Sequence, residues 1–310
     1  MENWDLIVIG AGPAGLAAGI YGTRSGLETL VLDEKIAGGT AADAPIIQNY
    51  LGFSSIVGLE LAQKMADHAK NAGVRIREFE EATQIDLKPK TMTVRSSKTV
   101  YETKTIIIAT GGKYRQLGVP GETHFRGRGV SYCGLCDGPL FKGKQLLVVG
   151  GGNSALITAL YLADIASKVK IAHRKDAFRG EDTLVKTLKE KQNIETLLNT
   201  EVKEIKGDKL VKSVVLSNNA TGETRETLID GVFVQVGEDP NSRLAKEAGV
   251  AVDEDDYIVV DVRQRTNVNG VFAAGDVTNH PVKQIGTAVG QGTTAATEAY
   301  GYVRRPYYKQ

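Results

Sequence analysis

The sequence predicts an α/β fold of two domains, with the second domain inserted into the first. Three observations predict this fold. A glycine-rich turn follows a short apolar run twice, at residues 10–15 and again at residues 150–155. Each turn is followed by a helical pattern and a second apolar run, which together form a β-α-β unit. Segments rich in turn-forming residues, at 118–121 and 237–241, mark two places where the chain crosses between domains.

Length and composition are those of a protein with two ordinary globular domains. The chain has 310 residues, of which 42% are apolar and 24% are charged, and this length allows two separate cores. A net charge of +1 gives no electrostatic reason to expect nucleic acid or an anionic membrane as a partner. The most apolar stretch, residues 146–166, is interrupted by three glycines and does not have the pattern of a membrane span. Because the N-terminus lacks the positive region of a signal peptide, we expect a cytoplasmic protein.

The first β-α-β unit, residues 5–33, has the pattern of a dinucleotide site. The apolar run 6–9 leads into GAGPAG at residues 10–15, and a helix is expected from Pro13 to Ser25. Backbone N–H groups at the start of such a helix, together with the helix dipole, bind a pyrophosphate. Asp33 ends the second apolar run, where an acid accepts hydrogen bonds from free ribose hydroxyls, and Glu34 beside it could do the same. This unit therefore predicts a nucleotide with an unmodified ribose, such as FAD.

The second β-α-β unit, residues 145–174, ends with the opposite charge. GGGNSA at residues 150–155 follows an apolar run, and His173 ends the next strand. Arg174, Lys175 and Arg179 come after it, and bases at this place suit a ribose 2′-phosphate. Arginine can contact a phosphate in bidentate fashion, whereas lysine acts as a point charge. A run of charges is usually only a solvated surface, but its position at the ribose end of the unit favours NADPH.

The remaining elements complete two domains around these units. A helix is expected at 58–73, short strands at 75–79, 82–87 and 91–95, and a buried strand at 105–111. Further helices are expected at 181–191 and 287–303, and a strand at 270–276. The prediction is therefore an α/β chain of two Rossmann-like nucleotide-binding domains of the three-layer ββα type. Residues 1–117 and 242–310 are expected to form a discontinuous FAD-binding domain, and residues 118–241 an NADPH-binding domain.

Both cysteines of the chain, Cys133 and Cys136, belong to one Cys-Gly-Leu-Cys motif in the second domain. Structural zinc needs four ligands, and none of the four histidines has ligand spacing to this pair. An inert buried pair is a further alternative, but in a reducing compartment this spacing favours a redox-active dithiol. Asp137 follows at once, and its carboxyl could exchange protons with the thiolates or could simply cap a helix.

The order of these motifs resembles that of the low-molecular-weight thioredoxin reductases, which are class II pyridine nucleotide-disulfide oxidoreductases. The resemblance covers nearly the whole chain: GAGPAG, CGLCD, GGGNSA, the HRKDAFR segment that begins at His173 and a late AAGDV follow one another in the family's order. A cysteine pair just before the second glycine motif is highly specific to this family. The resemblance implies a flavoprotein that reduces thioredoxin, or a thioredoxin-like protein, with NADPH and that forms a homodimer.

The resemblance also implies which residues hold the two nucleotides. For FAD they are Gly10, Gly12, Pro13, Ala14, Asp33, Glu34, Gly39, Thr40, Asn49, Thr110, Gly111, Asp276, Gln284 and Ile285. For NADPH they are Gly152, Asn153, Ser154, His173, Arg174, Lys175 and Arg179. Four departures from the family pattern stand out: Thr40 stands where glutamine is usual, Lys175 replaces the second arginine of the phosphate clamp, Leu51 sits where proline is usual, and Gly134-Leu135 replaces the common Ala-Thr between the cysteines.

The catalytic residues implied by the resemblance are Cys133, Cys136 and Asp137. Cys136 is expected to face the flavin, Cys133 to attack the disulfide of thioredoxin, and Asp137 to act as acid and base. Because the cysteines and the nicotinamide need the same face of the flavin, the inserted domain is expected to rotate about the two crossings.

Three alternatives stay open at this point. A related dithiol oxidase would use FAD and the cysteine pair but would pass electrons to oxygen, and it would not need the cations within residues 174–179. The same reductase could take electrons from ferredoxin or a deazaflavin instead of NADPH. A redox sensor without turnover could bind nucleotides and use the cysteine pair to switch a partner interaction.

Overall fold

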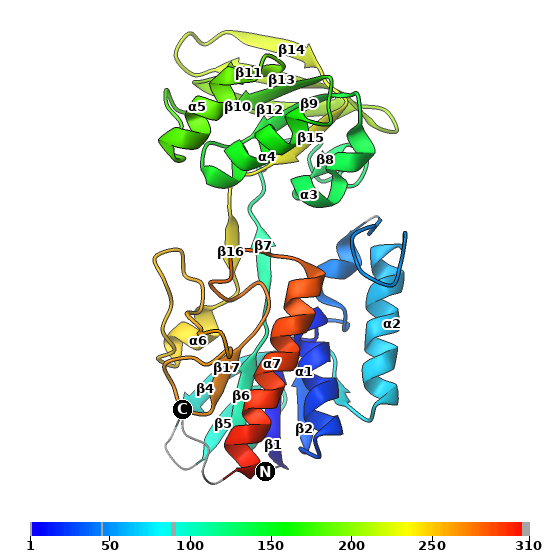
Figure 1. The fold of residues 1–310 in the computed structure, drawn as a ribbon, viewed down its shortest axis with the longest axis vertical. Helices are drawn as coiled ribbons and strands as arrows, with labels where there is room; N and C mark the ends of the chain where they lie inside the picture. Colours follow the sequence, from blue (N-terminus) through cyan, green and yellow to red (C-terminus); the bar gives the residue numbers. More distant parts are fainter. Residues whose placement is uncertain (1, 45, 88–90, 306–310) are drawn as a thin grey trace. The chain divides into compact units, whose positions relative to one another are not determined.

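The computed structural model describes residues 2–44, 46–87 and 91–305, and the chain divides into two compact units (Figure 1). Unit 1 comprises Met1–Lys113 and Asp239–Gln310, and unit 2 comprises Tyr114–Glu238. Unit 2 therefore interrupts unit 1 in the sequence. Each unit contains a sheet with parallel strands and helices packed against it, so the predicted α/β fold class is confirmed.

The sheet of unit 1 has seven strands among the described residues: β1 (Glu2–Ile9), β2 (Thr29–Leu32), β3 (Arg75–Arg77), β4 (Ala82–Leu87), β5 (Met92–Ser96), β6 (Val100–Ile108) and β17 (Val271–Ala273). Their order is β3-β2-β1-β6-β5-β4, and β17 also pairs with β6. The first part of β6 pairs with antiparallel β5, whereas its last residues pair with parallel β17. Because β2 and the ends of β1 and β6 are buried, these strands appear in the sequence as continuous apolar runs.

The helices of unit 1 are α1 (Pro13–Arg24), α2 (Gly58–Asn71), α6 (Arg243–Glu247) and α7 (Ile285–Arg304), with a short 3-10 helix η1 (Gly39–Asp43). Helices α1 and α7 lie side by side and bury small residues between them (Figure 1). A Cβ atom on Gly292 would lie only 2.0 Å from the carbonyl oxygen of Ala14, so this close approach requires glycine. The helix expected at 287–303 is found, and it begins two residues earlier because Gln284 and Thr287 form a capping box.

Unit 2 has three layers. Its parallel sheet contains β8 (Val130–Ser131), β9 (Gln145–Val149), β10 (Lys168–Ala172), β11 (Ile194–Leu197) and β15 (Gly231–Val234), in the order β11-β10-β9-β15-β8. An antiparallel sheet contains β12 (Thr200–Gly207), β13 (Val211–Asn218) and β14 (Thr224–Leu228). The helical elements are α3 (Gly134–Asp137), η2 (Gly138–Phe141), α4 (Asn153–Ala163) and α5 (Asp182–Glu190). Side chains of β9 alternate between two cores, with Leu147 and Val149 facing the antiparallel sheet and Leu146 and Val148 facing α4.

Two connecting segments join the units, and their strands β7 (Gly112–Tyr114) and β16 (Glu238–Pro240) pair with each other. The sequence prediction placed the domain boundaries after residues 117 and 241, whereas the compact units divide after Lys113 and Glu238. The turn at 118–121 was interpreted as a crossing, but it is fixed inside unit 2, where the Ile205 N–H donates to the Pro120 carbonyl at 2.9 Å.

None of the helices in the described part of the chain is long and apolar enough to cross a membrane.

Candidate active site and nucleotide-binding sites

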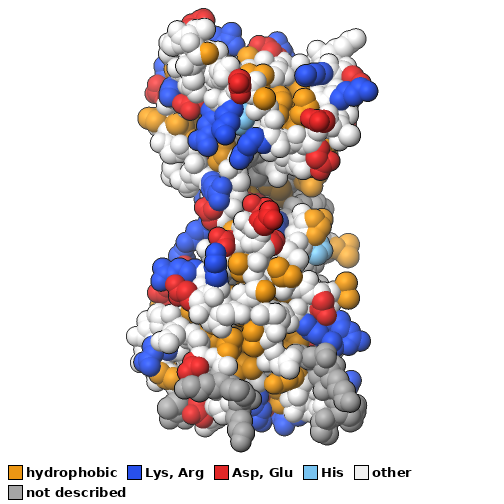
Figure 2. All heavy atoms as spheres, turned by 90° about the vertical axis from the view of Figure 1, so that its left-hand side faces the viewer, with side chains coloured by type: hydrophobic (Ala, Val, Ile, Leu, Met, Phe, Trp, Pro, Cys, Tyr) orange, Lys and Arg blue, Asp and Glu red, His pale blue; other side chains and the backbone are white. Residues whose placement is uncertain are grey.

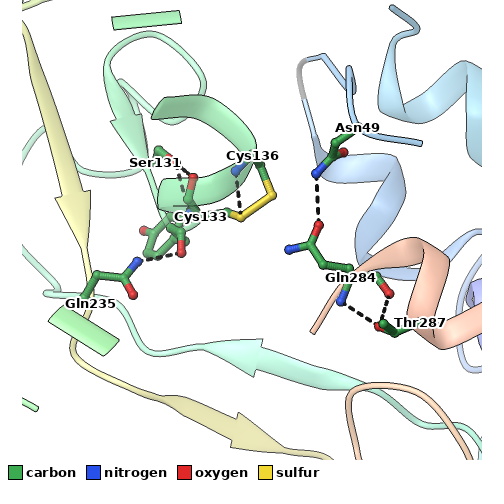
Figure 3. Close-up of a disulfide and its surroundings, with 8 residues drawn as sticks. Asn49, Ser131, Cys133, Cys136, Gln235, Gln284 and Thr287 are labelled. Atoms are coloured by element: carbon green, nitrogen blue, oxygen red, sulfur yellow. Dashed lines mark hydrogen bonds between the residues drawn. A yellow bond between two sulfur atoms is a disulfide. The ribbon is translucent and has the colours of Figure 1, made fainter. Parts of the chain in front are cut away.

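Cys133 and Cys136 form a disulfide at the start of α3 in unit 2 (Figure 3). Cys133 is the N-cap of this short helix, and its Sγ accepts a hydrogen bond from the Cys136 N–H at 3.2 Å. Gly134 lies against α4, where a Cβ atom would come within 2.7 Å of the Thr158 methyl group. Neither cysteine is fully buried, and Leu135 between them is 58% exposed. The disulfide is therefore open to a thiol reagent rather than sealed in a core.

Asp137 follows the disulfide, and burial favours the protonated form of its carboxyl group. Burial raises the pKa of Asp137, and a hydrogen bond with Ser131 offsets this only in part. Ser131 also accepts the Cys133 N–H on its hydroxyl at 3.0 Å. The sequence interpretation missed Ser131, whose only local signal is a hydroxyl two residues before the motif, where serine commonly bonds nearby backbone.

A cavity of about 570 Å³ opens in unit 1 at the carboxyl ends of β1, β2, β6 and β17. This is where parallel α/β sheets bind their ligands. All but one of the residues predicted to hold FAD line this cavity: Gly10, Gly12, Pro13, Ala14, Asp33, Glu34, Gly39, Thr40, Thr110, Gly111, Asp276, Gln284 and Ile285.

The exception, Asn49, does not line the cavity but supports it. Its side-chain amide donates to Gln284 Oε1 at 3.0 Å (Figure 3). The cavity also has a wall that the sequence interpretation missed, formed by β4 and α6 through Ala82, Thr83, Arg243, Leu244 and Glu247. No motif joins these residues, because they lie about 160 positions apart in the chain.

The glycine turn of unit 1 is so tight that side chains are excluded. A Cβ atom on Gly15 would lie 1.8 Å from the Gly10 carbonyl oxygen, and one on Gly10 would lie 2.2 Å from the Ala109 carbonyl oxygen. Gly12 caps α1 without any side-chain acceptor. The N–H groups at the start of α1 are therefore available for an anion in the cavity.

Burial raises the pKa of two acidic residues that line this cavity. Burial raises the pKa of Asp33, although its oxygens accept N–H groups from Ala11 at 2.6 Å and Lys35 at 2.8 Å. Each carboxylate oxygen can accept a further hydrogen bond, so Asp33 can still receive a ribose hydroxyl. Burial also raises the pKa of Asp276, and the nearby charge of Lys283 opposes the shift.

The glycine turn of unit 2 is built around His173. A Cβ atom on Gly151 would lie 2.3 Å from the His173 ring, and one on Gly150 would lie 2.1 Å from the Gln235 carbonyl oxygen. His173 is 5% exposed, and its buried Nε2 has no hydrogen-bond partner among the described residues. Burial lowers the pKa of His173, and the charges of Arg179, Arg174 and Lys175 lower it further. The imidazole is therefore neutral at pH 7.

Three exposed cations surround this histidine. The Arg179 N–H donates to the Gly151 carbonyl at 2.7 Å, which brings the segment back to the glycine turn. Within the described part of the chain, no ion pair involves Arg174, Lys175 or Arg179. Figure 2 shows several Lys and Arg side chains on one face of unit 2, with Asp and Glu side chains between them. The structure therefore brings a dense positive charge to the end of β10.

The other predicted residues of this site lie at the start of α4. Gly152 caps the helix without a side-chain acceptor, and Ser154 is exposed in its first turn. Asn153 is engaged with Glu181, accepting its N–H at 2.8 Å and donating to its carboxylate at 3.0 Å.

The comparisons with known proteins agree with this arrangement. A family model described as pyridine nucleotide-disulphide oxidoreductase matches residues 4–292. The chain belongs to this family of redox enzymes.

Several of its relatives within the family are thioredoxin reductases. The thioredoxin reductase of Bacillus subtilis (strain 168) is 42% identical over 301 residues, which cover 97% of this chain and 95% of the relative. The crystal structure of the thioredoxin reductase from Streptococcus pyogenes MGAS5005 has a TM-score of 0.92 at 38% identity and covers 97% of this chain and 98% of its own. A ferredoxin-flavin thioredoxin reductase from Clostridium acetobutylicum is 35% identical, with a TM-score of 0.52 and coverage of 97% and 98%. The resemblance to low-molecular-weight thioredoxin reductases is confirmed, and Cys133–Cys136 fits their redox-active disulfide.

Proposed function

We propose that this chain is a thioredoxin reductase that carries electrons from NADPH, by way of bound FAD and the Cys133–Cys136 disulfide, to a thioredoxin-like protein. The observation that carries the proposal is the accessible disulfide beside Asp137, in a unit whose glycine turn is surrounded by cations. The same proposal includes a homodimer that works in the cytoplasm and a rotation of unit 2 about the two connecting segments during the cycle. The family resemblance supports these parts of the proposal.

The cavity of unit 1 fits FAD. Its volume of about 570 Å³ is in the range of cofactor sites, and its glycine turn is too tight for any Cβ atom at Gly10 or Gly15. The open N–H groups of α1 would hold the pyrophosphate, Asp33 and Glu34 the adenosine ribose, and Asp276 the ribityl chain. When bound, the flavin would supply a relay for an electron pair between nicotinamide and disulfide.

The positive end of unit 2 fits NADPH. The ribose 2′-phosphate is a dianion, and Arg174, Lys175 and Arg179 are cations that form no ion pair with any residue that the structure describes. The buried Nε2 of His173 has no hydrogen-bond partner within the described ranges of the chain, and a ligand hydroxyl or phosphate would supply one. A dithiol oxidase would not need these cations, and neither would a reductase fed by ferredoxin. This charge favours NADPH over the donor named for the Clostridium acetobutylicum relative.

The chain's own residues would then perform two thiol exchanges. The Cys133 thiolate attacks one sulfur of the partner disulfide, so a Cys133–partner bond forms while the partner's S–S bond breaks. The departing thiolate takes a proton, which Asp137 can supply because burial raises its pKa. Cys136 then gives up its proton and attacks Cys133 Sγ as a thiolate, which restores the Cys133–Cys136 disulfide and releases the second partner thiolate, and this thiolate takes up that proton. In total, two electrons and two protons pass to the partner.

Steady-state NADPH consumption with oxidised thioredoxin tests this function. The wild type should consume NADPH only when thioredoxin is present, and Cys136→Ser should lose at least about 1,000-fold in this activity while its flavin is still reduced by NADPH. Asp164 is an exposed acid of unit 2, and the control variant Asp164→Asn should keep full activity. NADPH consumption that depends on oxygen rather than on thioredoxin would contradict the proposal and favour the dithiol oxidase.

A further inference from the structure

The residue before the redox disulfide, Tyr132, is held by an unusual number of partners. The residue is only 8% exposed, and its ring stacks on Tyr114 with a centroid distance of 5.5 Å and has the Arg126 guanidinium 5.5 Å from its centre. Its hydroxyl donates to Glu122 Oε1 at 2.8 Å. Its carbonyl oxygen accepts from Gln235 Nε2 at 2.8 Å, and Gln235 points toward the disulfide segment (Figure 3). The thiol chemistry proposed above uses none of these contacts.

Glu122 links Tyr132 to the part of unit 2 that directly follows the first connecting segment. Its carboxylate is 1% exposed and accepts three hydrogen bonds, from the Tyr132 hydroxyl and from the N–H groups of Leu117 at 2.9 Å and Gly118 at 2.8 Å. A carboxylate buried this deeply needs its hydrogen bonds, and charge-assisted bonds of this kind are strong. Burial and the bond to Glu122 raise the pKa of Tyr132, so its hydroxyl remains a donor at neutral pH.

The part of unit 2 that directly precedes the second connecting segment also contacts Tyr132. Gln235 lies shortly before β16, and the segments are joined where the Arg115 N–H donates to the Gly237 carbonyl at 2.9 Å. On its other side, Tyr132 leads directly into Cys133, whose N–H is bonded by Ser131. Tyr132 thus adjoins Cys133 in the chain and is bonded, through Glu122 and Gln235, to residues next to both connecting segments.

We propose that Tyr132 is a positioning residue that couples the redox state of the Cys133–Cys136 disulfide to the two connecting segments. Reduction adds two electrons and two protons, breaks the S–S bond and leaves two thiols that are no longer held at bonding distance. The backbone at Cys133 is then released, and Tyr132 transmits the shift through Glu122 and Gln235. The coupling rests on the proposed function only in that the disulfide must cycle between its two states.

Amide hydrogen exchange at Leu117 and Gly118 tests this coupling without thioredoxin or NADPH. The purified holoprotein is compared in its oxidised form and after reduction with dithiothreitol. In the wild type, reduction should accelerate exchange of both amides about fivefold or more, because the hydrogen bonds to Glu122 are loosened. In Tyr132→Phe, which keeps the ring and removes the hydroxyl, the two amides should exchange at the same rate in both redox states.

Tyr101→Phe is a matched control. The Tyr101 hydroxyl also donates to a buried carboxylate, that of Glu80 in unit 1. This variant loses the same kind of hydrogen bond and should keep the wild-type redox response at Leu117 and Gly118. With thioredoxin as substrate, Tyr132→Phe should lower kcat about tenfold and leave KM within about twofold, whereas Tyr101→Phe should change neither.

If Tyr132→Phe does not fold, Gln235→Leu is a second variant that tests the proposal. It removes the second contact of Tyr132 and should abolish the redox response of the Arg115 amide, which bonds Gly237. The coupling would be overturned if the exchange rates of these amides did not depend on the redox state in the wild type, or if they changed equally in the wild type and the variants. Amides that respond as expected in a protein that does not reduce thioredoxin would contradict the proposed function and support the coupling.

Discussion

The glycine turn of unit 1 and the glycine turn of unit 2 have the same backbone design but opposite charge around it. Each follows a buried parallel strand, each begins a helix capped by a glycine, and each excludes side chains at its first glycine. At the end of the next strand, unit 1 places the carboxylate of Asp33 and unit 2 places His173 with three cations. Under the proposed function, backbone sterics would make the phosphate site, whereas the side chains at the strand end would select the nucleotide.

The largest expected effect tests the steric contribution of the glycine turns. Gly15→Ala should prevent folding of unit 1, because the new Cβ atom would lie 1.8 Å from a carbonyl oxygen. Gly152→Ala should fold and keep its flavin, because nothing lies within 4 Å of a Cβ atom there, but its NADPH affinity should fall since the backbone can no longer approach the pyrophosphate. Soluble yield, flavin content and NADPH binding measure the difference. Equal behaviour of the two variants would refute the steric account.

The next effect tests selection in unit 2. Replacing Arg174 and Arg179 by Ala should raise KM for NADPH about 100-fold, because charge-assisted bonds to phosphate contribute roughly 1.5–3 kcal/mol each. KM for NADH, which lacks the 2′-phosphate, should change less than about threefold. Lys186→Ala, at an exposed position of α5, serves as the control. An equal rise in KM for both nucleotides would mean that these cations do not bind the ribose 2′-phosphate.

A smaller effect is expected from the corresponding acid of unit 1. Asp33→Asn replaces one acceptor oxygen by a donor, which leaves the N–H of Ala11 or Lys35 facing another N–H group. FAD affinity should fall about tenfold, measured by titrating apoprotein with FAD. Asp67→Asn, an exposed change on α2, should leave FAD affinity as it is. Unchanged FAD affinity in Asp33→Asn would show that this carboxylate only orders its loop.

The smallest effect concerns pH and the buried His173. Its pKa is lowered in the folded protein, so below its ordinary value of 6.5 the unfolded chain binds more protons than the folded one. Stability from this group is therefore fully present above pH 6.5 and is lost as the pH falls from there toward the lowered pKa. Thermal unfolding at pH 7.5 and 5.5 should show a larger drop in the wild type than in His173→Asn. An equal drop would mean that His173 is not held neutral.

Features formed by residues close together in the sequence could be predicted well, whereas contacts between residues far apart in the sequence could be predicted only poorly. The glycine turns, Asp33 and the cations after His173 could be predicted because strand, turn and helix follow one another within about thirty residues. The cavity wall of β4 and α6 and the bonds of Glu122 to Tyr132 could not, because no periodic pattern links residues that meet only through tertiary folding.

Two details show the same limit at smaller scale. The strand expected at 75–79 ends at Arg77, and Phe79 then adopts a positive φ of 55° that no local residue type announces. The turn at 118–121 has the residues of a linker but is bonded inside unit 2. Turn chemistry predicts where a chain bends, and only packing decides to which unit the bend belongs.

An anaerobic titration of the purified flavoprotein with NADPH and, separately, with NADH tests the central claim most directly. The account predicts fast bleaching of the flavin at stoichiometric NADPH and much weaker bleaching by NADH, because only the 2′-phosphate engages the cations at the end of β10. A flavin that neither nucleotide bleaches, but that dithionite still reduces, would contradict it. The donor would then be ferredoxin or a deazaflavin, and the charge after His173 would have another role.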